Sequence, residues 1–372
     1  MKQEKQIYRR ERRTFLIAGM CILIVFILSC LGGCGVNELE NQAFPLALGV
    51  EVEDNHAYHL YLAYPNLQDE KASENALSSD VYWEQTVPDL AVGMHRMSES
   101  SNKNPDLNHL KVLILQPQIF AQKETMESVL AFFEKETEAA WNTYVLMTEE
   151  PLEKLFSEEN QLPECMGIYL EDMLEEWEHV KKQAFVTVGT LMRQFYGTPE
   201  SACIPKLVVE QGKISIGGFT ILNRLQMAGN LSLEDGQKAL LLQNKEKGYQ
   251  FQMQDGTGVT LEQLHVKRRV TGEMDEEGTM YPVMKITVRG QIETTNRVGY
   301  SREKSDWKKK AEEELQEQLQ QLVTEWQKAG CDLTDSYPLL AGNDRKLWKI
   351  YKQDQSGYTA NLRYIIDVDL QM

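Results

Sequence analysis

The sequence predicts an α+β protein, with mixed sheets and packed helices in two or three subdomains after an N-terminal lipoprotein signal peptide. The chain has 372 residues, of which 42% are hydrophobic, and this is enough apolar material for about two packed domains. Segments with strand periodicity alternate with segments of helical periodicity, which is typical of helices packed on sheets. A short basic and apolar segment at the N-terminus differs from everything that follows it.

The first 33 residues have the three parts of a secretory signal peptide. Residues 1–13 carry six Lys and Arg against two Glu, a local charge of +4. An uninterrupted apolar run of 14 residues follows at positions 15–28, and small residues end it. We expect the basic end to stay in the cytoplasm, so that the rest of the chain faces outward.

The segment Leu31–Cys34 (LGGC) has the pattern of a bacterial lipobox, in which a cysteine receives a diacylglycerol before the peptide is cut in front of it. We therefore predict lipidation at Cys34. Cys30 is a poorer candidate, because bulky Leu28 stands where Gly32 stands in the first pattern. An uncleaved signal anchor is the alternative, since about 17 apolar residues are at the lower limit for a bilayer of about 30 Å. In both cases the protein is tethered to the membrane. Two acyl chains anchor a protein stably in the membrane, whereas one chain does not.

Charge and cysteine content exclude several classes of protein. The net charge is −17 for the whole chain and −21 without the leader, which argues against a nucleic-acid binder, because such proteins gather Lys and Arg against phosphates. The mean hydropathy of −0.43 excludes a polytopic membrane protein. Three further cysteines, Cys165, Cys203 and Cys331, are too scattered for a metal cluster or a disulfide framework, so we expect buried free thiols.

Residues 34–200 form the first predicted domain. A strand at residues 46–52 and a partner at 56–64 are expected to pair across a turn at 53–55, followed by a polar loop at 65–81. His56 and His59 resemble a metal pair, but residues three apart on a strand point to opposite faces, so we expect surface positions. Further strands are expected at residues 110–115 and 141–147, and helices at 88–97, 123–136, 163–180 and 186–195.

Residues 201–372 form the second predicted domain, after the turn-rich segment 197–201. Ser232 is expected to cap a helix that runs to Leu242, because acidic residues fill its first turn. A helix at residues 302–328 carries an apolar stripe shorter than four heptads, which favours packing on a sheet over a coiled coil. The stripe consists of Trp307, Ala311, Leu315, Leu319, Leu322, Val323 and Trp326. Strands are expected at residues 204–210, 214–222, 266–271, 281–294 and 364–370, with tight turns at 211–212 and 255–258.

The sequence contains no recognisable catalytic, metal or cofactor motif. G-x-S-x-G, H-E-x-x-H, the Walker loop and G-x-G-x-x-G are all missing. Gly217-Gly218 lies inside a strand pattern, where close packing explains it better than phosphate binding. Asp275–Glu277 is an acidic run that we expect in a solvated loop, and His109 is expected to have a structural role. We therefore predict a protein that is not an enzyme and holds no cofactor or metal.

Four stretches of the chain resemble the Ger(x)C family, the lipoprotein C subunits of bacterial spore germinant receptors. They are Cys34 with Asn37–Leu39 and Leu48–Glu51; Leu107–Ile114; Ile204–Phe219 with Leu231–Glu234 and Ala239–Leu242; and the helix at 302–328 with Cys331-Asp332 and Trp348. The resemblance runs from Cys34 almost to the C-terminus and rests on the order and spacing of these stretches. Gly35 and Asn108 depart from the usual Trp and Ser, which indicates a divergent member.

The resemblance implies an α+β receptor subunit without enzymatic activity. It would sit on the outer face of the spore inner membrane, associate with two integral-membrane subunits and be needed for the response to nutrient germinants. Two other functions stay open. A solute-binding lipoprotein of a transporter predicts two lobes with a ligand cleft between them. A cell-envelope hydrolase predicts two carboxyl groups about 5–10 Å apart in a deep pocket.

Overall fold

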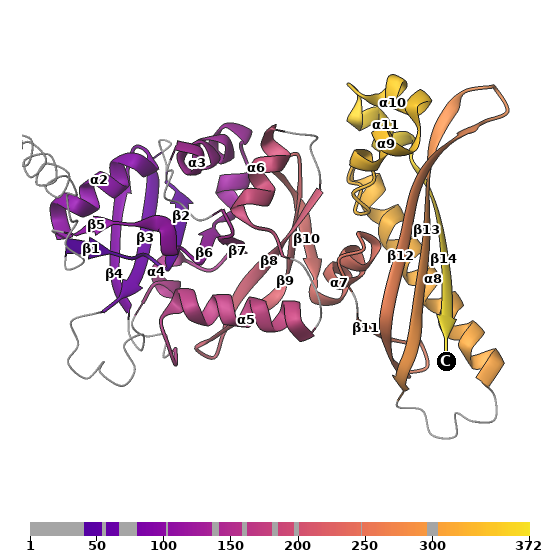
Figure 1. Cartoon of the computed structure of the whole chain (residues 1–372), viewed down its shortest axis with the longest axis horizontal. Coiled ribbons are helices and arrows are strands. Elements are labelled where there is room, and N and C mark those ends of the chain that lie inside the picture. The colour runs from indigo at the N-terminus through magenta and orange to yellow at the C-terminus, as the bar shows by residue number, and fades with distance from the viewer. Residues whose placement is uncertain are drawn as a thin grey trace, which may run out of the picture. The chain divides into compact units, whose positions relative to one another are not determined.

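An eight-stranded mixed sheet occupies the N-terminal part of the described chain (Figure 1), with the strand order β10-β9-β8-β7-β6-β2-β3-β4. Its strands are β2 (Ala47–Val52), β3 (Tyr58–Pro65), β4 (Asp80–Val87), β6 (Val112–Leu115), β7 (Tyr144–Thr148), β8 (Ser201–Glu210), β9 (Lys213–Asn223) and β10 (Gln226–Ser232). The computed structural model describes residues 41–53, 57–66, 80–101, 103–135, 141–157, 162–180, 185–196, 201–246, 248–295 and 304–372.

Helices cover both faces of this sheet (Figure 1). On one face pack α2 (Leu90–Ser101), α3 (Lys123–Lys135) and α6 (Val188–Tyr196); on the other pack α4 (Leu152–Leu155), α5 (Met166–Val180) and α7 (Leu233–Leu242). The central strand β6 is fully buried and pairs in parallel with β2 and β7. Its side chains alternate between the two cores, which explains why its sequence is apolar throughout. The predicted α+β class is confirmed.

The edge strand β4 was not among the predicted elements. It pairs antiparallel with β3 along its whole length, from Tyr58↔Val87 to Pro65↔Asp80. Its sequence, DVYWEQTV, has an apolar face at Val81, Trp83 and Val87 that Gln85 interrupts, and most of its residues are half-buried. Residues 54–55 of the expected hairpin turn and residues 67–79 of the expected polar loop lie outside the described residues. The ends of that expected loop belong to strands instead, residue 65 to β3 and residues 80–81 to β4.

Strands β8, β9 and β10 extend the same sheet beyond residue 200. Strand β8 pairs in parallel with β7 through Met147↔Lys206 and antiparallel with β9. The sheet therefore contains strands from both sides of the position where a domain boundary was predicted, and residues 197–200 themselves lie outside the described residues. The tight turn at Gln211-Gly212 is confirmed, since the φ angles of these residues are 53° and 75°.

Close packing explains the two glycines inside β9. A Cβ atom on Gly217 would lie 2.6 Å from Val208 Cγ1, and one on Gly218 would lie 2.5 Å from the carbonyl oxygen of Leu231 on β10. The second contact is with backbone, which cannot move aside as a side chain can. The sequence-based explanation of this pair is confirmed.

We expect Gly218→Ala to lower the free energy of unfolding by about 1–3 kcal/mol, because the new methyl group overlaps a backbone oxygen in a paired strand. Gly342→Ala in α9 (Tyr337–Asn343) is the matched control, since its Cβ would meet nothing within 4 Å. The control should leave stability unchanged or raise it by up to about 1 kcal/mol. Urea unfolding followed by circular dichroism measures both, and equal stability of the two variants would contradict the packing argument.

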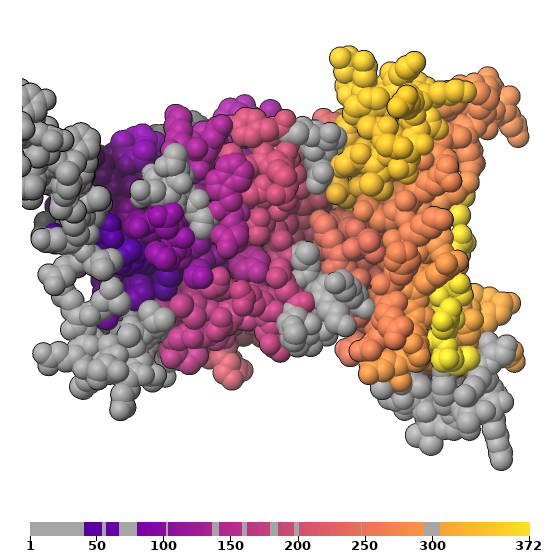
Figure 2. Space-filling model, in the orientation of Figure 1, coloured from indigo at the N-terminus to yellow at the C-terminus, as the bar shows by residue number. Residues whose placement is uncertain are grey.

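A second, four-stranded sheet forms the C-terminal part, with the order β11-β12-β13-β14. Its strands are β11 (Tyr249–Gln252), β12 (Gly258–Met274), β13 (Met280–Thr295) and β14 (Arg363–Gln371). Strands β12 and β13 form a long antiparallel hairpin, and β14 runs parallel to β13. Helix α8 (Lys304–Lys328) packs on one face together with α9, α10 (Arg345–Tyr351) and α11 (Gln355–Asn361). The last helices pack directly against β12 and β13 near the tip of the hairpin (Figure 2).

Helix α8 contributes to the cores of both sheets. Trp307, Leu315 and Val323 lie in the core of the C-terminal sheet, whereas Leu322 lies in a core shared with β8, β9 and α7. Six of the seven predicted stripe residues are buried, and Trp326 is half-buried against the shared core. The predicted stripe is therefore confirmed. Residues 43–372 form one compact unit.

The loop after α8 joins the two sheets through Asp332, whose carboxylate is buried. Its Oδ2 accepts from Ser336 N at 2.8 Å and Ser336 Oγ at 2.5 Å. Its Oδ1 accepts from Thr334 N at 2.9 Å, Thr334 Oγ1 at 2.5 Å and Tyr364 Oη at 3.0 Å. Ser201, at the start of β8, donates through Oγ to the Asp332 carbonyl at 2.9 Å. One short loop thus holds β8 of the first sheet and β14 of the second.

Arg268 of β12 holds the same loop from the other side. Its guanidinium donates to the carbonyl oxygens of Asp335 at 2.8 Å, of Thr334, and of Gln243 at 3.0 Å. Gln243 is the C-cap of α7, so this one side chain links the last turn of that helix to the loop. A planar guanidinium suits this arrangement, because its N–H groups point in several directions at once.

Candidate functional site

The predicted lipidation site, Cys34, lies outside the described residues together with the signal peptide and the alternative Cys30. Lipidation therefore stays a prediction. None of the helices in the part of the chain that the structure describes combines the length and the apolar character needed to cross a membrane.

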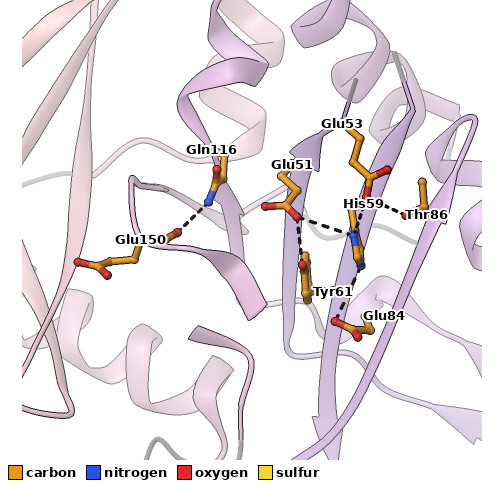
Figure 3. A network of polar contacts seen from close by, with 8 residues as sticks. All are labelled: Glu51, Glu53, His59, Tyr61, Glu84, Thr86, Gln116 and Glu150. Atoms are coloured by element: carbon orange, nitrogen blue, oxygen red, sulfur yellow. Dashed lines mark hydrogen bonds and ion pairs between the residues drawn. The ribbon is translucent and has the colours of Figure 1, made fainter. Parts of the chain in front are cut away.

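A cluster of titratable side chains surrounds His59 on one face of β2, β3 and β4 (Figure 3). His59 Nδ1 donates to Glu53 Oε1 at 3.1 Å and lies 3.8 Å from Glu51 Oε1. Its Nε2 lies 3.8 Å from Glu84 Oε2. Thr86 Oγ1 donates to the same Glu53 oxygen at 3.0 Å. The register of the three strands places these residues side by side, although Glu51 and Thr86 are 35 positions apart in the sequence.

Tyr61, two positions after His59 on β3, completes this cluster. Its ring stacks on His59 with centroids 4.5 Å apart and an interplanar angle of 8°. Its hydroxyl donates to Glu51 Oε1 at 3.0 Å. Burial and the neighbouring Glu51 carboxylate raise the pKa of Tyr61 above its usual range, so the phenol stays protonated and acts as a donor. In this arrangement Tyr61 orients a carboxylate beside an imidazole.

The cluster is a hydrogen-bonded network rather than a metal site. Among the described residues, no group of three or more His, Cys, Asp or Glu side chains is placed to hold a metal ion. The side chain of His59 is 20% exposed, so it is more enclosed than the predicted surface position, and His56 lies outside the described residues. Gln116 Nε2, also drawn in Figure 3, donates to the carbonyl of Glu150 at 2.7 Å and only ties two loops together.

The other singled-out residues are dispersed and have structural environments. His109 is exposed and meets the ring of Phe44 edge-on, with centroids 5.4 Å apart. Asp275 accepts from Glu277 N and Thr279 N at 3.0 and 2.8 Å, as a turn residue does. These positions are not brought together by the fold.

Cys165, Cys203 and Cys331 are buried thiols, as predicted. Burial raises the pKa of the Cys203 and Cys331 thiols to about 12. A thiol with so high a pKa holds its proton at neutral pH and is a poor nucleophile.

A small cavity of about 210 Å³ lies between α7 and the strands β11–β13. Carboxylates dominate its polar lining, among them Glu246, Glu262 and Glu293, together with the buried ring of Tyr249. Its volume is below the roughly 300–1,000 Å³ of typical small-molecule sites. It therefore gives little support to a transporter-type solute site.

Comparison with known families identifies the chain. A family described as the spore germination protein N-terminal domain matches residues 35–209, and one described as spore germination B3/GerAC-like, C-terminal, matches residues 217–372. A solved structure titled "Crystal Structure of the GerBC protein" has the same fold, with a TM-score of 0.56 at 16% identity over 87% of this chain and 96% of that one. A search of curated proteins found no match. The two family matches follow each other in order and together cover most of the chain, so this chain belongs to the GerAC-like family of spore germination proteins, as the resemblance to Ger(x)C proteins implied.

Proposed function

We propose that this chain is a lipid-anchored subunit of a spore germinant receptor that acts with two integral-membrane subunits in nutrient-triggered germination. The observation that carries the proposal is the order of parts along the chain: a lipobox ending at Cys34, followed directly by the two family matches from residue 35 to residue 372. In this proposal the lipid holds the protein at the outer face of the spore inner membrane. The folded part serves as a binding module and performs no catalysis.

The dispersed polar residues support a binding role. The His59 cluster, His109 and the buried cysteines lie apart from one another, and each has a structural partner or is enclosed in a core. The C-terminal sheet is covered by helices on one face, and its other face provides an extended surface of the kind that partner proteins contact. The membrane subunits are the partners that the family assignment favours.

We expect Cys34→Ala to release the protein from spore membranes and to slow nutrient-triggered germination. Without the cysteine no acyl chain can be attached, and the anchoring free energy of about 0.8 kcal/mol per buried CH₂ is lost. Membrane fractionation with immunoblotting and the loss of optical density of spores measure the two effects.

Cys30→Ala is the matched control for that experiment, because it removes the alternative cysteine and leaves LGGC intact. It should behave like the natural protein in both assays. Unchanged fractionation and germination in the Cys34→Ala variant would refute the proposed anchoring at Cys34. A defect seen only in the Cys30→Ala variant would mean that Cys30 is the lipidated residue.

The solute-binding alternative is tested by calorimetry with amino acids and sugars on the full chain in detergent. Tight direct binding of one of these compounds would favour it over the receptor subunit. Detergent extraction of spores followed by co-purification of two membrane subunits encoded next to this gene would favour the receptor.

A further inference from the structure

The C-terminal sheet has an outer face on the side away from α8–α11, formed by alternate residues of β12, β13 and β14. The helices pack on the opposite face, where Val266, Met284 and Ile366 belong to the core. Alternation along each strand places the residues in between on the outer face, where all of them except the buried Val283 are at least partly exposed. The strand register arranges them in four rows, each running across the three strands. The rows are His265–Arg289–Asp369, Lys267–Thr287–Asp367, Arg269–Lys285–Ile365 and Thr271–Val283–Arg363.

These four rows form a basic patch in an acidic protein. They carry five Lys and Arg and two Asp, whereas the whole chain has a net charge of −17. Side chains of one sign that lie side by side on a sheet repel one another, so the need for a stable fold does not explain this patch. It indicates a surface that meets something negatively charged.

Three of the five cations already have partners within the sheet. Lys285 Nζ lies 2.8 Å from Glu273 Oε1, and Arg289 Nε lies 3.3 Å from Asp369 Oδ2. The guanidinium of Arg363 lies over the ring of Tyr281, 3.9 Å from its centroid. These contacts are exposed, and they engage three of the five cations within the sheet.

Lys267 and Arg269 have no such partner. Both are exposed, and within the part of the chain that the structure describes no carboxylate lies at ion-pair distance from either. They are two positions apart on β12, so their side chains leave the sheet about 7 Å from each other on the same face. An extended polypeptide repeats its side chains at the same interval, so acidic residues at alternate positions would match the two cations.

The rim of the patch favours a protein over a membrane. Glu273 lies beyond one end of the four rows and Glu262 beyond the other, and Asp367 and Asp369 line the β14 edge. An anionic lipid surface laid on this face would bring its phosphates against all four carboxylates. Ile365, 42% exposed in the same row as Arg269, adds an apolar contact that a protein segment can use.

We propose that the outer face of the C-terminal sheet docks an acidic, extended segment of another protein, with Lys267 and Arg269 as its main contacts. The inference does not depend on the lipid anchor or on the identity of the membrane subunits. The segment carries Asp or Glu at alternate positions and a small apolar residue that reaches Ile365.

The test uses the full chain in detergent and a fluorescein-labelled eight-residue peptide of alternating Asp and Val, with an Asn-Val peptide as the neutral probe. Lys267→Glu/Arg269→Glu should weaken binding of the acidic peptide about tenfold or more, since two attractions become repulsions. Lys213→Glu/Lys309→Glu changes the net charge equally on exposed residues outside the patch and should bind like the natural protein. Fluorescence anisotropy at low and high salt gives the dissociation constants.

Each other outcome overturns the proposal. Equal weakening by both double variants would mean that net charge alone matters, and no binding of the peptide to the natural protein would mean that the face takes no such segment. Binding to phosphatidylglycerol vesicles that depends on Lys267 and Arg269, without peptide binding, would assign the patch to lipid. Self-association lost in the patch variant, seen by sedimentation, would assign it to a second copy. If the reversed variant melts early, Lys267→Gln/Arg269→Gln replaces it and should give a smaller loss in the same direction.

Discussion

Asp332→Ala is expected to lower the free energy of unfolding by about 3–5 kcal/mol, the largest effect of any single substitution proposed for this protein. The substitution removes the acceptor of five hydrogen bonds whose donors come from Thr334, Ser336 and Tyr364. The side chain is buried, so water cannot easily replace it, and each abandoned buried donor costs about 1–3 kcal/mol. Relaxation of the loop recovers part of this loss.

Two further variants sharpen the measurement. Asp332→Asn keeps one acceptor oxygen and should fall between the natural protein and the alanine variant. Glu325→Ala, on the exposed face of α8, is the control for removing a carboxylate and should change stability by less than about 0.5 kcal/mol. Chemical unfolding followed by circular dichroism gives the three values. A loss below about 1 kcal/mol for Asp332→Ala would show that this carboxylate does not hold the loop.

Arg268→Ala should lower the free energy of unfolding by about 2–4 kcal/mol. It leaves the carbonyl oxygens of Gln243, Thr334 and Asp335 without this donor in a largely buried position. Arg268→Lys should restore less than half of the loss, because an ammonium group cannot reproduce the geometry of the guanidinium. Full rescue by lysine would mean that only the positive charge matters.

The two substitutions act on the same loop, so their effects should not add. A double-mutant cycle of Asp332→Ala and Arg268→Ala should show a coupling of at least about 0.5 kcal/mol. Strict additivity would indicate that the carboxylate and the guanidinium hold the loop independently.

Periodic segments were the part of the fold that could be predicted from the sequence. The stripe of α8 and the buried strand β6 follow simple spacings, because each of these elements buries one side or all of itself in a core. The capping role of Ser232 is equally local, since its hydroxyl accepts from Asp235 N three residues later.

Elements without such spacing escaped prediction. Strand β4 lies at a sheet edge, and Gln85 interrupts the apolar alternation of Val81, Trp83 and Val87. Helices α9, α10 and α11 have seven residues each, which is too short for a periodic stripe to stand out. Their positions depend on packing against the C-terminal sheet, which a local pattern does not contain.

The candidate sites divide in the same way. The pattern at Leu31–Cys34 is a linear signal, so lipidation could be predicted without coordinates, and it stays a prediction. The junction at Asp332 could not, because Ser201 and Arg268 lie 131 and 66 residues away from the loop atoms that they bind. The basic patch likewise depends on the register that sets β12, β13 and β14 side by side.

The shared helix α8 has a thermodynamic consequence. Because Leu315 belongs to one core and Leu322 to the other, neither sheet can lose this helix without exposing apolar surface on both. The two sheets are therefore coupled in unfolding and behave as one cooperative system, although each has its own hydrogen-bonded ladder. A partner that displaced α8 from one sheet would at the same time expose apolar residues of the other. Binding at one sheet would therefore change the stability of the other sheet.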